Sequence, residues 1–193
     1  MPHTPPLPNR FFFSDCTRVP EWRQVCRSLP RGAGVILRDY DNPLRRDLAA
    51  NMAQMCQALG LTFLIAADPD LALRHKAGLH CPQALMPRLR RSFTRVRAAN
   101  PAALITAAAH SPGAIFAAAE AGVDAAFVSP VFATQSGIDK ASLGPVKMAH
   151  WITAARLPVL ALGGMSAAAH RRLTNVGHQG YAAIGDWRPK SAG

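Results

Sequence analysis

The sequence has few cysteines, and none of them forms a CxxC pair. Cys16, Cys26, Cys56 and Cys81 are spread widely through 193 residues. This spacing argues against a zinc site and against a dense disulfide framework. We therefore expect reduced thiols and a cytoplasmic protein.

The chain also lacks a long hydrophobic run. No uninterrupted apolar stretch approaches the roughly 20 residues that a membrane helix requires, so we expect no membrane span. The first ten residues, MPHTPPLPNR, contain four prolines and no apolar core, which predicts a flexible lead-in over 1–10 and no signal peptide. With 49% hydrophobic residues in the chain, residues 11–193 are predicted to form one compact domain.

Acidic residues are scarce. The chain has 11 of them against 22 lysines and arginines, and the resulting charge of +11 attracts phosphate groups or nucleic acid without specificity. The densest basic stretch, PRLRRSFTRVRAAN at 87–100, spaces Leu89, Phe93 and Val96 as one face of an amphipathic helix. No aromatic stacking motif or zinc-finger spacing accompanies it, so a solvated face is favoured over a nucleic-acid-binding surface.

Short apolar runs recur along the whole chain. There are eight: FFFSD, GVILRD, TFLIAAD, AGLHC, ALITAAAH, AAFVSPVF, PVLALGG and GYAAIGD. Such runs are typical of strands buried on both faces, and segments with helical patterning separate most of them, which indicates parallel pairing. We predict an α/β fold, a single (β/α)8 TIM barrel with short helices and loops. An open doubly wound sheet is the alternative.

Glycines follow the last two of these runs. In a TIM barrel the active site lies at the carboxyl ends of the strands, and phosphate often binds after strands seven and eight. Gly163 and Gly164 end the seventh run, Ser166 is placed to cap the next helix, and Gly185 follows the eighth. Glycine lets an anion approach backbone N–H groups closely, so we predict a phosphate cup here. Tight turns are the simpler explanation.

A single imidazole, His110, follows three alanines in AAAHSPGA at 107–114. By itself this pattern fits a histidine that is merely hydrogen-bonded at the end of a strand. In a barrel, however, His110 would stand on the catalytic rim, with Ser111 as the N-cap of the following helix. Imidazole accepts and donates protons near neutral pH, which makes His110 a candidate proton-transfer catalyst.

Several segments, taken in order, resemble the family of thiamine phosphate synthases and TenI-like thiazole tautomerases. LRD at 37–39 resembles the family's LREK, and IAADPDLALRHKAGLHCPQ at 65–83 is similar to INDxxDLALxxxADGVHLGQ. AEAGVDAAFVSPVFAT at 119–134 resembles AxxxGADYxxxGPVFPT, and LPVLALGGM at 157–165 is similar to IPVVAIGGI. The resemblance implies a (β/α)8 barrel whose ligands are thiamine precursors.

This chain departs from the synthases at their metal site. In the family, two aspartates bind the magnesium of a pyrimidine pyrophosphate, and the match places Ala67 and Leu85 at those positions. Neither side chain supplies the hard oxygen ligand that magnesium requires. Asp68 and Asp70 are close enough in sequence for a shifted ligand to be conceivable. We expect no metal or other cofactor.

Further departures remove polar contacts to pyrimidine or pyrophosphate. The family's glutamine before LRE is Ile36, its lysine after LRE is Tyr40, and a serine near the catalytic histidine is Ala108. Lys140 lies three places beyond the position of a family lysine, which leaves its role open.

Two substrate-binding candidates survive these departures. Arg38 ends the second apolar run, and Thr134 matches a threonine of the family's loop after the sixth run. His80 also matches a family histidine, but that histidine is common to both branches, so we expect a structural role. Cys81 beside it is expected to be a small buried hydrophobe.

The surviving features resemble the TenI-like branch. That resemblance implies a thiazole tautomerase in which His110 moves a proton and the cup of Gly163, Gly164 and Gly185 holds a thiazole phosphate. The alternatives are a thiamine phosphate synthase with an altered magnesium-pyrophosphate site, and a non-catalytic phosphate-ligand binding or regulatory protein. The sequence leaves the oligomeric state open.

Overall fold

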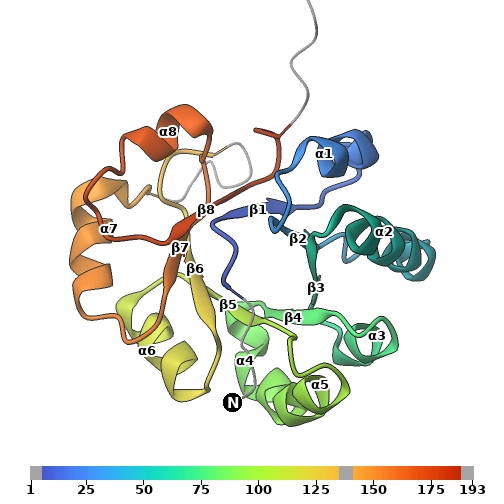
Figure 1. Cartoon of the computed structure of the whole chain (residues 1–193). Coiled ribbons are helices and arrows are strands. Elements are labelled where there is room, and N and C mark those ends of the chain that lie inside the picture. Colours follow the sequence, from blue (N-terminus) through green and yellow to red (C-terminus); the bar gives the residue numbers. More distant parts are fainter. Residues whose placement is uncertain (1–5, 135–140, 188–193) are drawn as a thin grey trace, which may run out of the picture.

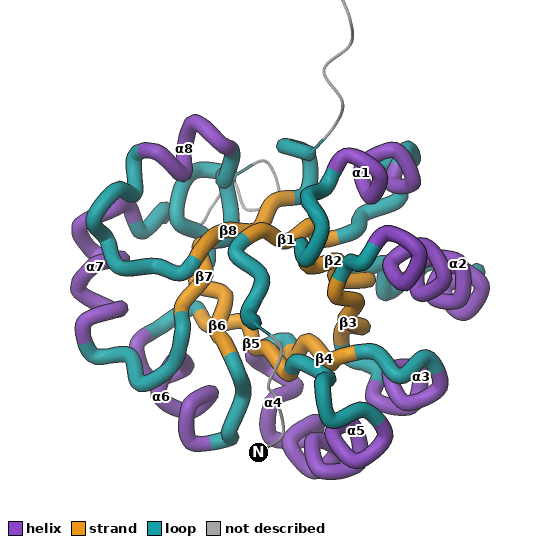
Figure 2. The backbone as a smooth tube through the Cα atoms, in the orientation of Figure 1, coloured by secondary structure: helices purple, strands orange, loops and turns teal. Residues whose placement is uncertain are grey.

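Eight parallel strands form a closed barrel in the computed structural model of the chain. The structure describes residues 6–134 and 141–187. Each strand pairs with its successor, and β8 pairs with β1, so the open-sheet alternative is excluded. Figure 1 shows the strands as a ring surrounded by helices, and Figure 2 shows loops joining the two layers. The predicted TIM barrel is confirmed.

The eight predicted apolar runs are the eight strands. In β1 (Arg10–Phe13), Phe11 and Phe13 belong to the cluster inside the barrel, whereas Phe12 packs against the helices outside it. Both faces of the strands are therefore covered, which explains why the runs are continuously apolar. The other strands are β2 (Gly34–Leu37), β3 (Thr62–Ala66), β4 (Gly78–Cys81), β5 (Ile105–Ala109), β6 (Ala125–Val128), β7 (Val159–Ala161) and β8 (Gly180–Ala183).

Short helices connect successive strands. Three of them begin at side-chain caps, because Asp68, Ser111 and Ser166 each accept a hydrogen bond from the backbone N–H three residues later. The helices are α1 (Trp22–Ser28), α2 (Arg45–Leu59), α3 (Pro69–Arg74), α4 (Met86–Leu89), α5 (Phe93–Ala99), α6 (Pro112–Glu120), α7 (Gly144–Thr153) and α8 (Ala167–Arg171). No helix in the described ranges is long and apolar enough to cross a membrane.

The basic segment at 87–100 differs from its prediction. It forms α4, the 3-10 turn η2 (Arg90–Ser92) and α5 instead of one continuous helix. The prediction of a single helix was wrong because a tighter turn interrupts it. Leu89, Phe93 and Val96 are nevertheless all buried, so the predicted apolar face is correct.

The residues before β1 cover the amino-terminal end of the barrel. In Figure 1 this segment crosses the ring from β1 toward β5. Leu7 packs against the interior cluster, Pro8 is buried, and the carbonyl of Asn9 accepts a hydrogen bond from Tyr181 N–H at 3.0 Å. Residues 1–5 lie outside the described part of the chain, so the flexible lead-in stays a prediction.

Candidate active site at the carboxyl ends of the strands

The predicted site residues within the described ranges border two adjoining cavities at the carboxyl ends of the strands. One, of about 360 Å³, is bordered by Arg38, His80 and His110, and we call it the central pocket. The other, of about 290 Å³, is bordered by Gly164 and Gly185, and we call it the glycine cup. A ligand can extend from one into the other because they share four residues: Thr134, Leu162, Gly163 and Ile184.

His110 stands exposed at the end of β5, on the rim of the central pocket. Its Nδ1 lies 2.7 Å from the carbonyl oxygen of Ser129, just beyond β6, and 3.2 Å from the hydroxyl oxygen of the same residue. A carbonyl oxygen only accepts hydrogen bonds, so Nδ1 of the neutral ring carries the proton. The lone pair is then on Nε2, where the ring can accept a proton.

Two contacts fix the backbone around this imidazole. The side-chain oxygen of Gln83 accepts a hydrogen bond from His110 N–H at 2.7 Å. The hydroxyl of Ser111 accepts from Ala114 N–H at 3.1 Å and caps α6, as the sequence predicts. Sequence reasoning did not identify Gln83 or Ser129 as site residues, although both fall within segments that resemble the family.

His80 lies beneath the central pocket, with only 3% of its surface exposed. Its Nδ1 is 3.0 Å from the Thr106 hydroxyl, and the rings of Phe13 and Phe127 meet it edge-on. Burial lowers the pKa of His80 to about 3, so the ring is neutral at physiological pH. Burial also raises the pKa of the neighbouring Cys81 thiol to about 12, which makes it a poor nucleophile.

Arg38 lines the central pocket, but its guanidinium is already paired. Nη2 lies 2.6 Å from a carboxylate oxygen of Asp15, and about a third of the Arg38 side chain, 34%, is exposed. Arginine has five N–H donors, so the pair leaves donors for a ligand carboxylate. Thr134 lies between the two cavities, and Lys140 lies outside the described residues.

The three glycines of the cup differ in backbone conformation and in the space around them. Gly163 and Gly164 have left-handed φ angles of 85° and 62°. A Cβ on Gly164 would lie 2.4 Å from the carbonyl oxygen of Ala133, and one on Gly163 would lie 2.8 Å from the Cα of Pro130. A Cβ on Gly185 would meet nothing within 4 Å. Turn geometry thus accounts for the first two glycines, while Gly185 opens space in the cup.

Two charged residues at the cup were not predicted. Arg18, from the connection after β1, borders the cup and supplies positive charge. Asp186 follows Gly185, and its carboxylate accepts a hydrogen bond from Ala167 N–H at 3.0 Å. The sequence gives one indication of these two residues, because Asp186 directly follows Gly185 at the end of a strand.

The two positions at which the resemblance implies magnesium ligands carry no oxygen-bearing side chain. Ala67, just after β3, has a left-handed φ of 64°, and Leu85 lies 37% exposed in the 3-10 turn η1 (Gln83–Leu85). Within residues 6–134 and 141–187, no group of three or more His, Cys, Asp or Glu residues could hold a metal ion. At these two positions, therefore, no side chain can ligate a magnesium ion.

The neighbouring aspartates are engaged elsewhere. Asp68 caps α3 by accepting from Leu71 N–H at 2.9 Å, and its other oxygen lies 3.4 Å from Arg45 Nη1. Arg45 Nη2 also donates to the carbonyl of Ala66 at 2.6 Å, so a fixed cation already stands at the end of β3. Asp70 is 81% exposed and is paired with an arginine at the surface.

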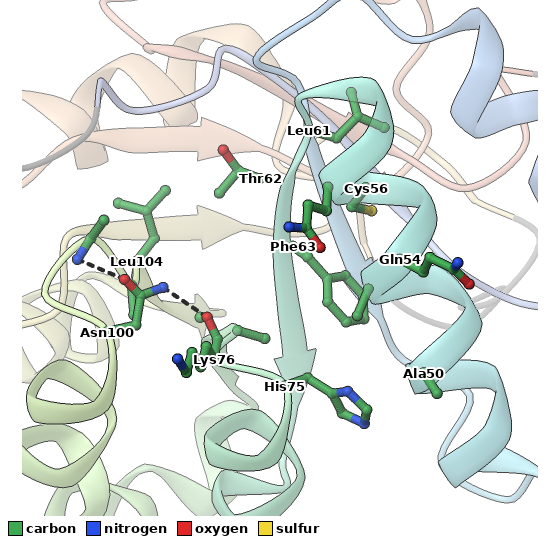
Figure 3. Close-up of a pocket in the computed structure, with 16 residues that line it drawn as sticks. Ala50, Gln54, Cys56, Leu61, Thr62, Phe63, His75, Lys76, Asn100 and Leu104 are labelled. Atoms are coloured by element: carbon green, nitrogen blue, oxygen red, sulfur yellow. Dashed lines mark hydrogen bonds between the residues drawn. The ribbon is translucent and has the colours of Figure 1, made fainter.

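Another cavity, of about 550 Å³, lies outside the barrel between α2 and the segments that lead into β4 and β5 (Figure 3). Asn100 braces its edge: its Nδ2 donates to the Lys76 carbonyl at 2.7 Å, and its Oδ1 accepts from Ala102 N–H at 3.0 Å. Thr62 and Leu104 place this cavity at the amino-terminal ends of the strands. It is therefore remote from His110 and the glycine cup.

Comparisons with known proteins agree with this architecture. A family model described as thiamine monophosphate synthase matches residues 17–186. The chain is 32% identical over 142 residues to a thiamine-phosphate synthase of Synechococcus sp. (strain WH7803), covering 73% of this chain and 39% of that protein. It is 31% identical over 140 residues to a thiamine-phosphate synthase of Geobacillus kaustophilus (strain HTA426), covering 71% and 61%.

The match thus spans less than two thirds of either relative. Among solved structures, a thiamine phosphate pyrophosphorylase from Pyrococcus furiosus has the same fold, with a TM-score of 0.73 at 20% identity. That likeness covers 91% of this chain and 85% of the other.

Proposed function

Because the chain belongs to the thiamine monophosphate synthase/TenI family, we propose that it binds a thiazole phosphate and acts as a TenI-like thiazole tautomerase. The observation that carries the proposal is the hydrogen bond made by the His110 ring. Its Nδ1–H is held by the Ser129 carbonyl at 2.7 Å, which leaves Nε2 as a proton acceptor on the pocket rim. This is the arrangement that a general acid–base catalyst requires.

The two cavities suggest how the ligand lies. The phosphate occupies the glycine cup, where Gly185 leaves space and Arg18 adds positive charge. The thiazole ring occupies the central pocket, and Arg38 can meet a carboxylate on that ring. This orientation places the ring beside His110.

Tautomerisation then needs only one shuttling proton. His110 Nε2 takes a proton from one atom of the thiazole ring, and the resulting imidazolium is stabilised by its Nδ1–H bond to Ser129. His110 returns the proton to another ring atom, so the enzyme ends in its starting state. No redox partner is needed, because only a proton and a double bond move.

A thiamine phosphate synthase is the second candidate, and the named relatives favour it. Ala67 and Leu85 weigh against it, because a leaving pyrophosphate needs charge neutralisation that these residues cannot recruit through magnesium. Arg45 does not supply the missing positive charge, because its guanidinium already contacts the Ala66 carbonyl and the Asp68 carboxylate. It also borders neither the central pocket nor the glycine cup. A non-catalytic binding protein is the third candidate. The four free cysteines agree with the cytoplasmic location that we propose.

The test replaces His110 by asparagine. If His110 transfers the proton, His110→Asn retains thiazole phosphate binding by calorimetry and lowers tautomerisation by roughly 100- to 10,000-fold. His150→Asn, on the exposed side of α7, is the matched control and should retain full turnover. Unchanged turnover in His110→Asn would assign the imidazole to structure.

Assays of the same proteins distinguish the two other candidate functions, the synthase and the non-catalytic binding protein. Magnesium-dependent condensation of a pyrimidine pyrophosphate with thiazole phosphate would favour the synthase. Tight thiazole phosphate binding without either reaction would favour the binding protein.

A further inference from the structure

Two residues that flank His110 contact it through acceptor atoms. Gln83 follows β4 and Ser129 follows β6, so they lie on either side of β5, which ends just before His110. The side-chain oxygen of Gln83 accepts from the backbone N–H of His110 at 2.7 Å, and the Ser129 carbonyl oxygen accepts from the ring Nδ1–H at 2.7 Å. All three residues border the central pocket.

The Gln83 carboxamide keeps its own donors unused. A backbone N–H only donates, so the amide atom 2.7 Å from the His110 nitrogen is the oxygen Oε1, and the other amide atom is Nε2. Within residues 6–134 and 141–187, the Gln83 side chain makes no further hydrogen bond. Its two N–H groups are therefore available to a ligand at the exposed edge of the pocket.

The half-buried hydroxyl of Ser129 is also an unused donor. Its oxygen lies 3.2 Å from His110 Nδ1, but that nitrogen already carries a proton directed at the nearer carbonyl oxygen, so the hydroxyl cannot donate to it. The hydroxyl has no other acceptor in the described part of the chain. The family pattern has a glycine here, directly before PVF at 130–132, so this hydroxyl distinguishes the chain.

Free donors beside His110 suit the proposed reaction. When Nε2 removes a proton from a ring atom, the electron pair of that bond moves into the conjugated double bonds of the ring. Negative charge then builds up on the electronegative atoms of the ligand. It disappears when His110 returns the proton, because the electron pair forms the new bond. Donors that are already in place stabilise such a charge without reorganisation.

We propose that the Gln83 amide and the Ser129 hydroxyl form a donor pair that hydrogen-bonds the thiazole ring and stabilises the charge formed when His110 removes a proton. Neither residue transfers a proton itself. The inference rests on the proposed function, because it takes a thiazole as the ligand of the central pocket and His110 as its base.

Ser129→Ala tests the hydroxyl, because it keeps the carbonyl that holds Nδ1–H. We expect kcat for tautomerisation to fall roughly 10- to 100-fold, the effect of one hydrogen bond to a charged acceptor, while KM stays close to that of the parent. Ser129→Thr retains a hydroxyl and should recover most of the turnover. Ser92→Ala is the matched control, since the Ser92 hydroxyl makes no capping bond and borders neither cavity.

Gln83→Glu tests the amide donors. A carboxylate oxygen still accepts from His110 N–H, but no N–H remains for the ligand. We expect kcat to fall at least as far as in Ser129→Ala, because the carboxylate also repels the charge that builds up on the ring. Gln83→Met, which likewise lacks donors, provides a second measurement if thermal melts show that the glutamate variant is unstable.

Asn42→Asp is the matched control for the change of charge. The Asn42 side chain, in the connection after β2, also accepts from a backbone N–H, that of Leu44 at 2.9 Å. It borders neither the central pocket nor the glycine cup, so its amide-to-carboxylate change should leave kcat as in the parent.

The outcomes distinguish the two proposals. Lower kcat in both Ser129→Ala and Gln83→Glu, with both controls unchanged, is the expected result. If the parent is active and His110→Asn is not, full kcat in either of the two variants overturns the donor pair and leaves the proposed function standing. If the parent tautomerises no thiazole phosphate, the proposed function fails and the inference fails with it.

Discussion

Gly164 and Gly185 border the same cup, but only Gly185 can carry a side chain without a clash against the backbone. Gly164 has a left-handed φ of 62° and packs against the backbone of the β6–α7 connection. Gly185 has open space where a Cβ would be. A branched side chain at Gly185 therefore meets no described atom at its Cβ, and we expect it to narrow the cup that Gly185 lines.

We accordingly expect Gly185→Val to bind thiazole phosphate at least about tenfold more weakly than the parent while keeping its melting temperature. Gly164→Val should lose both binding and stability, because its Cβ would lie 2.4 Å from the Ala133 carbonyl oxygen. Calorimetry and thermal melts measure the two properties separately. Full thiazole phosphate affinity in Gly185→Val would remove the phosphate assignment from the cup.

The residues of the site were predictable only in part. His110 and the cup glycines could be found because strand ends and glycine pairs are visible in the sequence. Gln83, Arg18 and Asp186 were missed, because a sequence pattern does not tell which way a loop side chain turns. The close neighbour of Gly164, the Ala133 carbonyl, could not be predicted either, because it comes from another connection of the barrel.

The connection between β4 and β5 shows what periodicity can predict at the scale of an element. The apolar spacing of Leu89, Phe93 and Val96 correctly predicts their burial. The interruption at η2 is not visible in that spacing, because a single 3-10 turn shifts the apolar face only slightly. Two arginines of this element pair with aspartates of the chain: Arg97 contacts Asp124 at 2.9 Å, and Arg95 contacts Asp70 at 3.4 Å.

This element should be stabilised mainly by its apolar face. Phe93 is 5% exposed, so Phe93→Ala should lower the free energy of unfolding by about 3–5 kcal/mol. Arg91→Ala, on the exposed side, should change it by less than about 0.5 kcal/mol. Urea denaturation of both variants tests the difference. Comparable losses in the two would show that the basic face contributes to folding.

For the molecule as a whole, the buried histidine makes stability depend on pH. The folded protein keeps His80 neutral down to a pKa of about 3, whereas the unfolded chain protonates it below about 6.5. Stability is therefore fully present above about pH 6.5 and falls as the pH drops toward 3. Burial also lowers the pKa values of His75, His170 and His178, which act in the same direction.

We expect the free energy of unfolding to be about 2 kcal/mol lower at pH 5 than at pH 7 through His80 alone. His80→Gln should have a shallower pH dependence over this range, whatever its stability at pH 7. Urea titrations of parent and variant at several pH values measure the two slopes. Parallel slopes would mean that His80 is protonated equally in the folded and unfolded states.

The pairing of β1 with β8 has a consequence for how the protein is made. Tyr181 donates to the Asn9 carbonyl, and Phe12 pairs with Ala183, so the first strand acquires its second neighbour from the last one. The ribosome must therefore release β8 before the ring can close. Until then the edge of β1 that later pairs with β8 has no neighbouring strand. Chaperones that recognise apolar strands should therefore bind the nascent chain once β1 has emerged and leave when β8 has paired with it.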